Sequence, residues 1–181
     1  MNRAVFLIGI MSVLFFCGIP MYGKDCRVGV LFLELPESYP KPLVTRYDTS
    51  AKLVVGSTLR ENESQSFISI METYINKYPV ESRERLLKLY PEKELGPFLA
   101  KKKSMYDDFQ TLDVSTQKIN KLEFVKLLWC GNQKVTGAKM RGIYLVVRDG
   151  DTILELNYVD YDDYFDLCSE EAMKIFRTLS R

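Results

Sequence analysis

An Asp-Gly pair between two alternating apolar runs is the feature that most restricts the fold of this 181-residue chain. Asp149-Gly150 separates residues 139–148 from residues 152–159. A two-residue hairpin turn needs positive φ at its central positions, which Asp and Gly both tolerate. On each side, apolar residues alternate with others, as in strands that bury one face. They are Ile143, Leu145 and Val147 in the first run, and Leu154, Leu156 and Tyr158 in the second. The pattern predicts an antiparallel meander.

The rest of the chain predicts a mixed α and β domain whose helices fall mainly in the middle and at the end. Proline residues end several apolar runs, and Ser169 stands where it could cap a closing amphipathic helix. The predicted strands cover residues 28–35, 52–57, 67–71 and 118–131, with a short helix directly after residue 71, and the predicted helices cover residues 83–90, 98–109 and 169–179.

Three segments together resemble a known architecture. They are residues 33–39, closed by prolines, the block 142–147 with its Asp149-Gly150 turn, and the final helix at 171–179. This layout resembles the PsbP and Mog1-like α/β/α sandwich family. The resemblance implies an α+β fold, with helices packed on an antiparallel sheet, and a protein that binds other proteins without a catalytic signature. An NTF2-like cone is the alternative fold, although it would normally begin with helices.

The first 23 residues predict export. Arg3 precedes an uncharged apolar run of 13 residues at 4–16, which is the length of a signal-peptide core and shorter than the roughly 20 residues of a membrane span. We therefore interpret residues 1–23 as a signal segment and residues 24–181 as a single α+β domain. The predicted location is the periplasm or the extracellular space, and a signal anchor is the alternative.

Cys17 follows Leu14-Phe15-Phe16 and precedes glycine, which is the outline of a bacterial lipoprotein signal. Phe16 is larger than the residue that usually precedes an acylated cysteine. Cys17 is thus a candidate lipidation site that would make the protein a membrane-anchored lipoprotein, or it leaves with the leader. Of the other cysteines, Cys26 and Cys168 are our preferred disulfide, which would tie the two ends of the domain, with Cys130 as the competing partner.

The chain contains no histidine. This removes the usual Ser-His-Asp and Cys-His nucleophile systems and imidazole metal sites. No other catalytic or cofactor motif is evident, so we expect a protein that is not an enzyme and that has no cofactor. A carboxylate pair such as Glu155 with Asp160 is the remaining enzymatic hypothesis. The net charge of +1 predicts no attraction to nucleic acid.

The densest acidic stretch, residues 160–166, lies between the predicted hairpin and the closing helix. Phe165 occupies the position where a calcium-binding EF-hand loop requires glycine, so we expect a solvated acidic loop and no metal site. Tyrosine offers both apolar area and a hydrogen-bonding hydroxyl group. We therefore predict a partner-binding surface here, consisting of Tyr158, Tyr161, Asp162, Asp163 and Tyr164.

Taken together, the sequence predicts an exported, non-enzymatic accessory or adaptor protein that binds another protein or an envelope component. Membrane contact is expected only through a lipid anchor or signal anchor. The alternative is a small-molecule or lipid carrier with a pocket between the sheet and the helices.

Overall fold

The computed structural model describes residues 23–56, 67–89 and 95–180. The predicted signal segment, Cys17 included, lies outside the described residues except for Gly23. Within the described ranges, no helix combines the length and the apolar character needed to cross a membrane.

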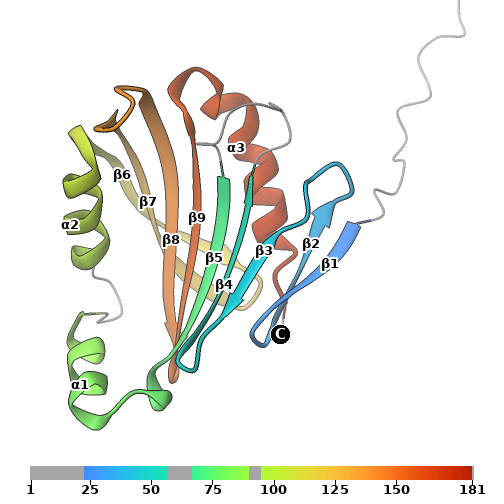
Figure 1. The fold of residues 1–181 in the computed structure, drawn as a ribbon, viewed down its shortest axis with the longest axis vertical. Helices are drawn as coiled ribbons and strands as arrows, with labels where there is room; N and C mark the ends of the chain where they lie inside the picture. The colour runs from blue at the N-terminus through green and yellow to red at the C-terminus, as the bar shows by residue number, and fades with distance from the viewer. Residues whose placement is uncertain (1–22, 57–66, 90–94, 181) are drawn as a thin grey trace, which may run out of the picture.

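Seven antiparallel strands form the main sheet, in the order β3-β4-β5-β9-β8-β7-β6 (Figure 1). The β8–β9 hairpin lies near its centre, and Gly150 adopts the positive φ of 58° that the turn requires. The predicted hairpin is therefore confirmed, but its turn lies one residue later than predicted, at Gly150-Asp151, because Asp149 still pairs with Thr152 as the last residue of β8. The strands are β3 (Leu43–Arg46), β4 (Ser50–Gly56), β5 (Phe67–Tyr74), β6 (Tyr106–Ile119), β7 (Leu122–Gln133), β8 (Lys139–Asp149) and β9 (Thr152–Tyr161).

One face of the sheet is covered by α3 (Asp162–Arg177) and by a separate two-stranded hairpin, β1 (Gly23–Val28) and β2 (Leu31–Pro36). Phe32 of β2 also pairs with Ser180, which fixes the end of the chain to the hairpin. The larger hydrophobic core lies between these layers. Its fully buried members include Val28, Leu33, Leu35, Leu53, Ile70, Leu145, Leu156 and Phe176.

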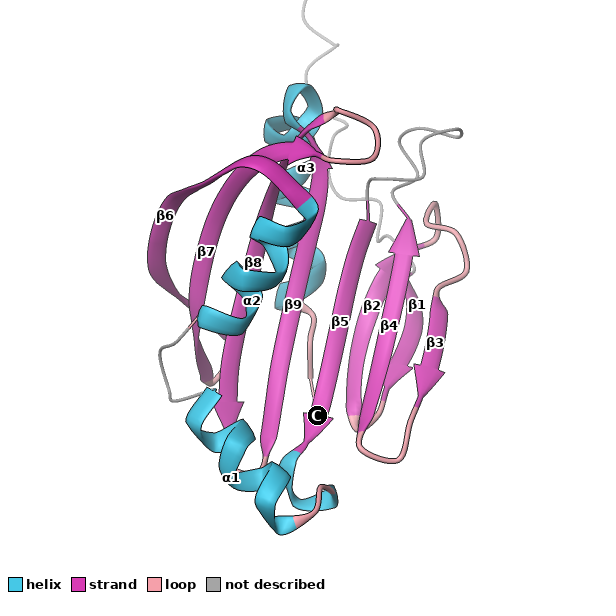
Figure 2. Ribbon diagram, turned by 60° about the vertical axis from the view of Figure 1, so that its left-hand side comes forward, coloured by secondary structure: helices cyan, strands magenta, loops and turns pink. Residues whose placement is uncertain are grey.

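The opposite face carries α1 (Val80–Leu89), which follows the short 3-10 helix η1 (Ile75–Lys77), and α2 (Gly96–Met105). Figure 2 shows α2 in front of the sheet and α3 behind it. A second hydrophobic cluster, centred on Trp129, lies on this side. The layers are thus helix, sheet, and helix with hairpin, which confirms the predicted α+β sandwich with helices packed on an antiparallel sheet.

Two element boundaries differ from the sequence prediction. The predicted helix at 98–109 ends at Met105, and the chain continues as β6. Most of β6 is exposed on both faces because it is an edge strand, so it lacks the alternation that reveals a half-buried strand. The closing helix begins at Asp162 and not at Ser169, because Phe165 and Cys168 extend its buried stripe toward the N-terminus.

The predicted strand at 28–35 is also two strands. Gly29 has a φ of 59° and turns the chain between β1 and β2. A Cβ atom on Gly29 would lie 2.0 Å from the Tyr74 hydroxyl oxygen and 2.1 Å from Glu72 Oε2. Only glycine combines this backbone conformation with so close an approach.

Candidate functional site

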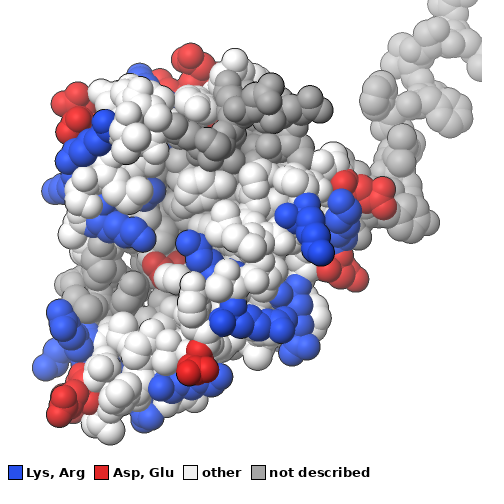
Figure 3. Space-filling view, viewed as in Figure 1, with Lys and Arg blue, Asp and Glu red and all other residues white. Residues whose placement is uncertain are grey.

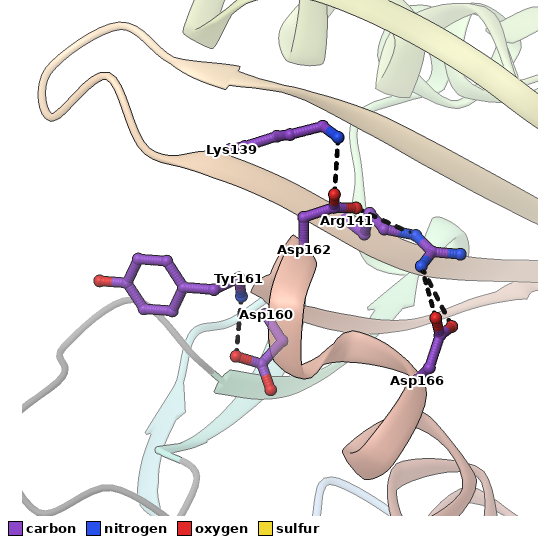
Figure 4. Close-up of polar contacts among 6 residues, drawn as sticks. All are labelled: Lys139, Arg141, Asp160, Tyr161, Asp162 and Asp166. Atoms are coloured by element: carbon purple, nitrogen blue, oxygen red, sulfur yellow. Dashed lines mark hydrogen bonds and ion pairs between the residues drawn. The ribbon is translucent and has the colours of Figure 1, made fainter.

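The acidic stretch that the sequence singled out forms ion pairs with β8 (Figure 4). Lys139 Nζ lies 2.6 Å from Asp162 Oδ2, and Arg141 Nε lies 3.5 Å from Asp162 Oδ1. Arg141 also donates two hydrogen bonds from Nη1 to Asp166, at 3.0 and 3.1 Å. These contacts hold the first turns of α3 against β8. The predicted loop is therefore wrong, because Asp162, Asp163 and Asp166 belong to a helix. Asp163 and Asp166 are nevertheless exposed to solvent.

Tyr158, which was predicted to belong to the partner-binding surface, is buried and only 2% exposed. Its ring lies 5.6 Å from that of Phe165, and its hydroxyl group donates a 2.7 Å hydrogen bond to the buried Asp160 carboxylate. Burial and this carboxylate raise the pKa of Tyr158. The Tyr158 side chain points from β9 toward α3. The prediction that Tyr158 belongs to a partner-binding surface is therefore wrong.

The other four predicted surface residues remain accessible to different degrees. Tyr161 and Asp162 are half-buried, whereas Asp163 and Tyr164 are exposed. Within the described ranges, no three cysteine, aspartate or glutamate side chains are grouped so that they could hold a metal ion.

The preferred Cys26–Cys168 disulfide is not formed. Cys26 carries a buried free thiol that donates a weak hydrogen bond to the Lys24 carbonyl oxygen at 3.5 Å. Burial, with Asp25 nearby, raises the pKa of this thiol. Cys26 and Cys168 contribute to the same hydrophobic core as separate apolar side chains. The ends of the domain are joined instead by the backbone pairing of Phe32 with Ser180.

The alternation of side chains along β9 separates the two carboxylates of the enzymatic hypothesis. Asp160 accepts a hydrogen bond from Tyr158, on the α3 side of the sheet. Glu155 accepts one from Tyr144, which belongs to the hydrophobic cluster on the α2 side. Successive residues of a strand point to opposite faces. The two carboxylates therefore cannot act on one substrate together.

A basic groove lies at the edge of the sandwich, between β1 and the start of β3. Its volume is about 490 Å³, and it is lined by Lys24, Asp25, Cys26, Arg27, Lys41, Pro42 and Val44. The lining thus includes three basic residues and one acidic residue. Figure 3 shows basic side chains gathered over β1 and β3, with acidic side chains beside them.

Two of the cations in the basic groove are held in place by backbone carbonyl groups. Lys24 Nζ donates to the carbonyl oxygen atoms of Glu37, at 2.9 Å, and Tyr39, at 3.2 Å. Arg27 Nε donates to the Gly29 carbonyl oxygen at 2.9 Å, and its guanidinium group lies 5.4 Å from the centre of the Phe32 ring. No sequence pattern indicated this groove, because its residues come from segments that were not predicted to be strands.

A buried lysine lies on the α2 side of the sheet. Lys102 is 6% exposed, and its Nζ atom lies 4.2 Å from the ring centre of Trp129, 5.1 Å from that of Tyr106 and 5.2 Å from that of Phe98. Burial, reinforced by Lys101, lowers the pKa of Lys102 to about 7. Lys102 lies between the exposed Lys101 and Lys103 on α2, and it alone of the three is buried, where aromatic rings surround its Nζ atom.

No family model matches the chain, and no curated protein matches it in sequence. Several solved structures are similar. LpqN, involved in cell envelope biogenesis of Mycobacterium tuberculosis, has 14% identity and a TM-score of 0.47, covering 88% of this chain and 86% of its own. PA94 from Pseudomonas aeruginosa, a protein of unknown function, has 10% identity and a TM-score of 0.46, with coverages of 88% and 96%.

Cyanobacterial PsbP (CyanoP) from Synechocystis sp. PCC 6803 has 8% identity and a TM-score of 0.51. The match covers 93% of this chain and 99% of that one. At this level of identity the likeness concerns the fold. The comparison therefore shows that this chain has a PsbP-like fold, the architecture that its sequence resembles.

Proposed function

We propose that the protein is an exported, non-enzymatic accessory protein that uses the basic groove to bind an acidic segment of a partner protein in the envelope. The observation that carries this proposal is the lining of the groove, which includes the three basic residues Lys24, Arg27 and Lys41 and a single acidic residue, Asp25. Lys24 and Arg27 are already positioned by backbone carbonyl groups, so less side-chain freedom is lost when a partner binds.

The surroundings of the groove favour a protein segment with both acidic and apolar residues. Leu43 is 68% exposed and Tyr47 is 62% exposed, and both lie on or directly after β3. Apolar area next to charge is typical of binding surfaces. Addition of a partner strand to β3 is disfavoured, because this edge strand has only four residues and follows Pro42. Recognition would therefore come mainly from side chains.

Export is supported by the apolar run at 4–16 and by Arg3 before it. Expression in a bacterial host, followed by mass measurement of the mature chain, tests it. A mature chain that lacks the leader is expected. Labelled palmitate is incorporated if Cys17 is acylated, and Cys17→Ser abolishes that label. A full-length chain retained in the cytoplasm would contradict export.

Binding is tested with a photo-crosslinking residue at Val44, in the basic groove, and with a control at the exposed Thr111 on the opposite edge of the sheet. The probe is a synthetic peptide of alternating glutamate and leucine, compared with its lysine counterpart. We expect crosslinking of the acidic peptide at Val44 only. The double variant R27E/K41E should weaken binding at least about tenfold.

The matched control changes the same number of charges elsewhere. Lys118 and Lys121 are exposed near the β6–β7 turn, so K118E/K121E alters net charge equally without touching the groove. If this control weakens binding as much as R27E/K41E does, the interaction reflects overall charge, and the groove is not the site. Circular dichroism shows whether each variant is folded.

A further inference from the structure

Four polar side chains occupy neighbouring positions on the α2 side of the sheet, where apolar residues would be expected. We call them the polar block: Ser69 on β5, Tyr144 on β8, and Glu155 and Asn157 on β9. In the strand register, Asn157 lies directly between Ser69 and Tyr144. Glu155 is two residues earlier on β9 and therefore faces the same side. The block is a compact polar area near the centre of a seven-stranded sheet.

The hydrogen-bonding groups of the polar block are incompletely satisfied. The Tyr144 hydroxyl group donates to Glu155 Oε1 at 2.5 Å. The Tyr144 ring is fixed by stacking on Phe98, with ring centres 3.7 Å apart and nearly parallel. Asn157 Oδ1, in contrast, is buried and has no hydrogen-bond partner in the part of the chain that the structure describes. A buried acceptor without a donor is rare in folded proteins and calls for an explanation.

The space in front of the polar block is partly open. Ser69, Glu155 and Asn157 are half-buried, as are the apolar Val54 and Met71 beside them. Figure 3 shows this side of the molecule hollowed between the two helices and the sheet, with an acidic and a basic side chain at its floor. A partly open apolar surface with a few convergent polar groups is the usual form of a small-ligand site.

The charges around Glu155 leave its carboxylate available. Lys52 and Lys101 are close enough to favour the charged form of Glu155, yet neither forms an ion pair with it among the described residues. Both lysines are exposed, so solvent screens them. Burial is the larger influence and raises the pKa of Glu155.

We infer that the polar block binds the protonated amine of a small amphiphile. Glu155 and Asn157 Oδ1 accept hydrogen bonds from the ammonium group, while Val54 and Met71 contact the apolar chain. An ammonium group suits this block because it has three donors and no acceptor. It would supply both the missing donor for Asn157 and the opposite charge for Glu155. This site is separate from the basic groove and goes beyond the proposed protein-binding role.

The test compares octylammonium, octanol and octanoate, which share one alkyl chain and differ in their head group. Binding is measured by calorimetry and by the fluorescence of Trp129, the only tryptophan of the chain. We expect octylammonium to bind at least about tenfold more tightly than octanol. Glu155→Gln keeps the size of the side chain and an acceptor for Tyr144 but removes the charge. It should weaken octylammonium binding at least about tenfold and change octanol binding less than about twofold.

Asn157→Leu, which removes the unpaired acceptor, should also weaken octylammonium binding. Glu123→Gln is the matched control, because Glu123 is exposed on β7 and lies outside the block. R27E/K41E, which tests the basic groove, should leave octylammonium binding unchanged, so the two proposals can fail separately. The inference is overturned if octanoate binds as tightly as octylammonium, if Glu155→Gln has no effect, or if none of the three compounds binds at millimolar concentration.

Discussion

The indole ring of Trp129 lies so close to the backbone of Gly142 that a Cβ atom at position 142 would be 2.5 Å from the ring carbons Cε2 and Cζ2. The glycine on β8 thus makes room for the large side chain on β7, to which it is directly paired. Trp129 in turn provides the surface on which Lys102 rests. A residue without a side chain therefore makes room for part of the aromatic surface that α2 contacts.

Gly142→Ala should destabilise the protein by about 1–3 kcal/mol, because the fully buried Trp129 cannot move without displacing its neighbours. Chemical denaturation measures the effect. Gly96→Ala, at the start of α2, is the control. A Cβ atom there would have no described atom within 4 Å, so a change below about 0.5 kcal/mol is expected. Equal effects of the two substitutions would show that the close approach of Trp129 to position 142 does not affect stability.

Lys102 should make stability depend on pH. Its pKa is about 7 in the folded chain, against 10.5 ordinarily. Between these values the unfolded chain holds a proton that the folded chain has released, so stability rises as pH increases through this interval. We expect Lys102→Met to remove up to about 3 kcal/mol of the difference between pH 7 and about pH 9. The aromatic rings stabilise the ammonium group and reduce this figure.

The measurement is the free energy of unfolding at several pH values for Lys102→Met, compared with Lys103→Met. Lys103 is exposed on the same helix, so its removal should leave the pH dependence as it is in the parent chain. If the free energy of unfolding depends on pH in the same way in both variants, the burial of Lys102 does not cause the pH dependence. The comparison of variants also cancels the titration of other groups that the chains share.

The sequence revealed the elements in which one face is buried and the other is not. The β8–β9 hairpin combines that alternation with a two-residue turn whose chemistry admits few alternatives. The strand β6 was missed because an exposed edge strand carries polar residues on both faces. The strand β1 was missed because Lys24, Asp25 and Arg27 interrupt its apolar residues, and β3 was missed because it has only four residues, most of them exposed.

Candidate sites were harder to predict than helices and strands. A site depends on which helices and strands lie side by side in the fold, and the local sequence does not show this. The acidic stretch near α3 was visible in the sequence, but its pairing with Lys139 and Arg141 depends on β8 lying beside the helix. The polar block joins Ser69 with Asn157, which are far apart in the sequence and adjacent only through the β5–β9 register. No local pattern could indicate either arrangement.

Glu72 should be needed to hold the β1–β2 hairpin on the main sheet. This fully buried residue of β5 accepts hydrogen bonds through Oε2 from the Val30 backbone N–H, at 3.0 Å, and from the Tyr74 hydroxyl group, at 2.7 Å. Glu72→Ala leaves both donors unpaired, at a cost of roughly 2–4 kcal/mol. Hydrogen exchange at the Val30 amide should accelerate more than exchange in β8.

The exposed Glu81 on α1 provides the comparison for Glu72. Glu81→Ala should change stability by less than about 0.5 kcal/mol and leave Val30 exchange unaltered. Unchanged protection of the Val30 amide in Glu72→Ala would mean that the hairpin is held by its apolar face alone.

The Cys26 thiol should react slowly with alkylating reagents in the native protein and quickly after unfolding, because it is buried and its pKa is raised. Mass spectrometry under non-reducing conditions, with and without denaturant, follows the modification. Cys130 is half-buried and should react first. A peptide in which Cys26 is bonded to Cys168 would reinstate the disulfide that the structure lacks.

Glu155→Gln should stabilise the protein at neutral pH even though it removes the charge proposed to bind an amine. Burial raises the pKa of Glu155 above its ordinary value of 4.5. Between the two values the folded chain keeps a proton that the unfolded chain has lost, so stability falls as pH rises through this interval. Glutamine has no such titration and retains an acceptor for the Tyr144 hydroxyl group. The thermal stability of Glu155→Gln should therefore be higher than that of the parent chain at pH 7, and the difference should vanish near pH 4.

The polar and charged side chains around Glu155 do not change the prediction that Glu155→Gln stabilises the protein at pH 7. Tyr144 donates to it from β8, while Lys52 on β4 and Lys101 on α2 favour its charged form more weakly than burial opposes it. Thermal unfolding of Glu155→Gln and of the exposed control Glu123→Gln at both pH values measures the difference. A loss of stability at pH 7 in Glu155→Gln would show that the charge is already compensated within the protein. A gain would mark Glu155 as a residue kept for binding at the expense of stability.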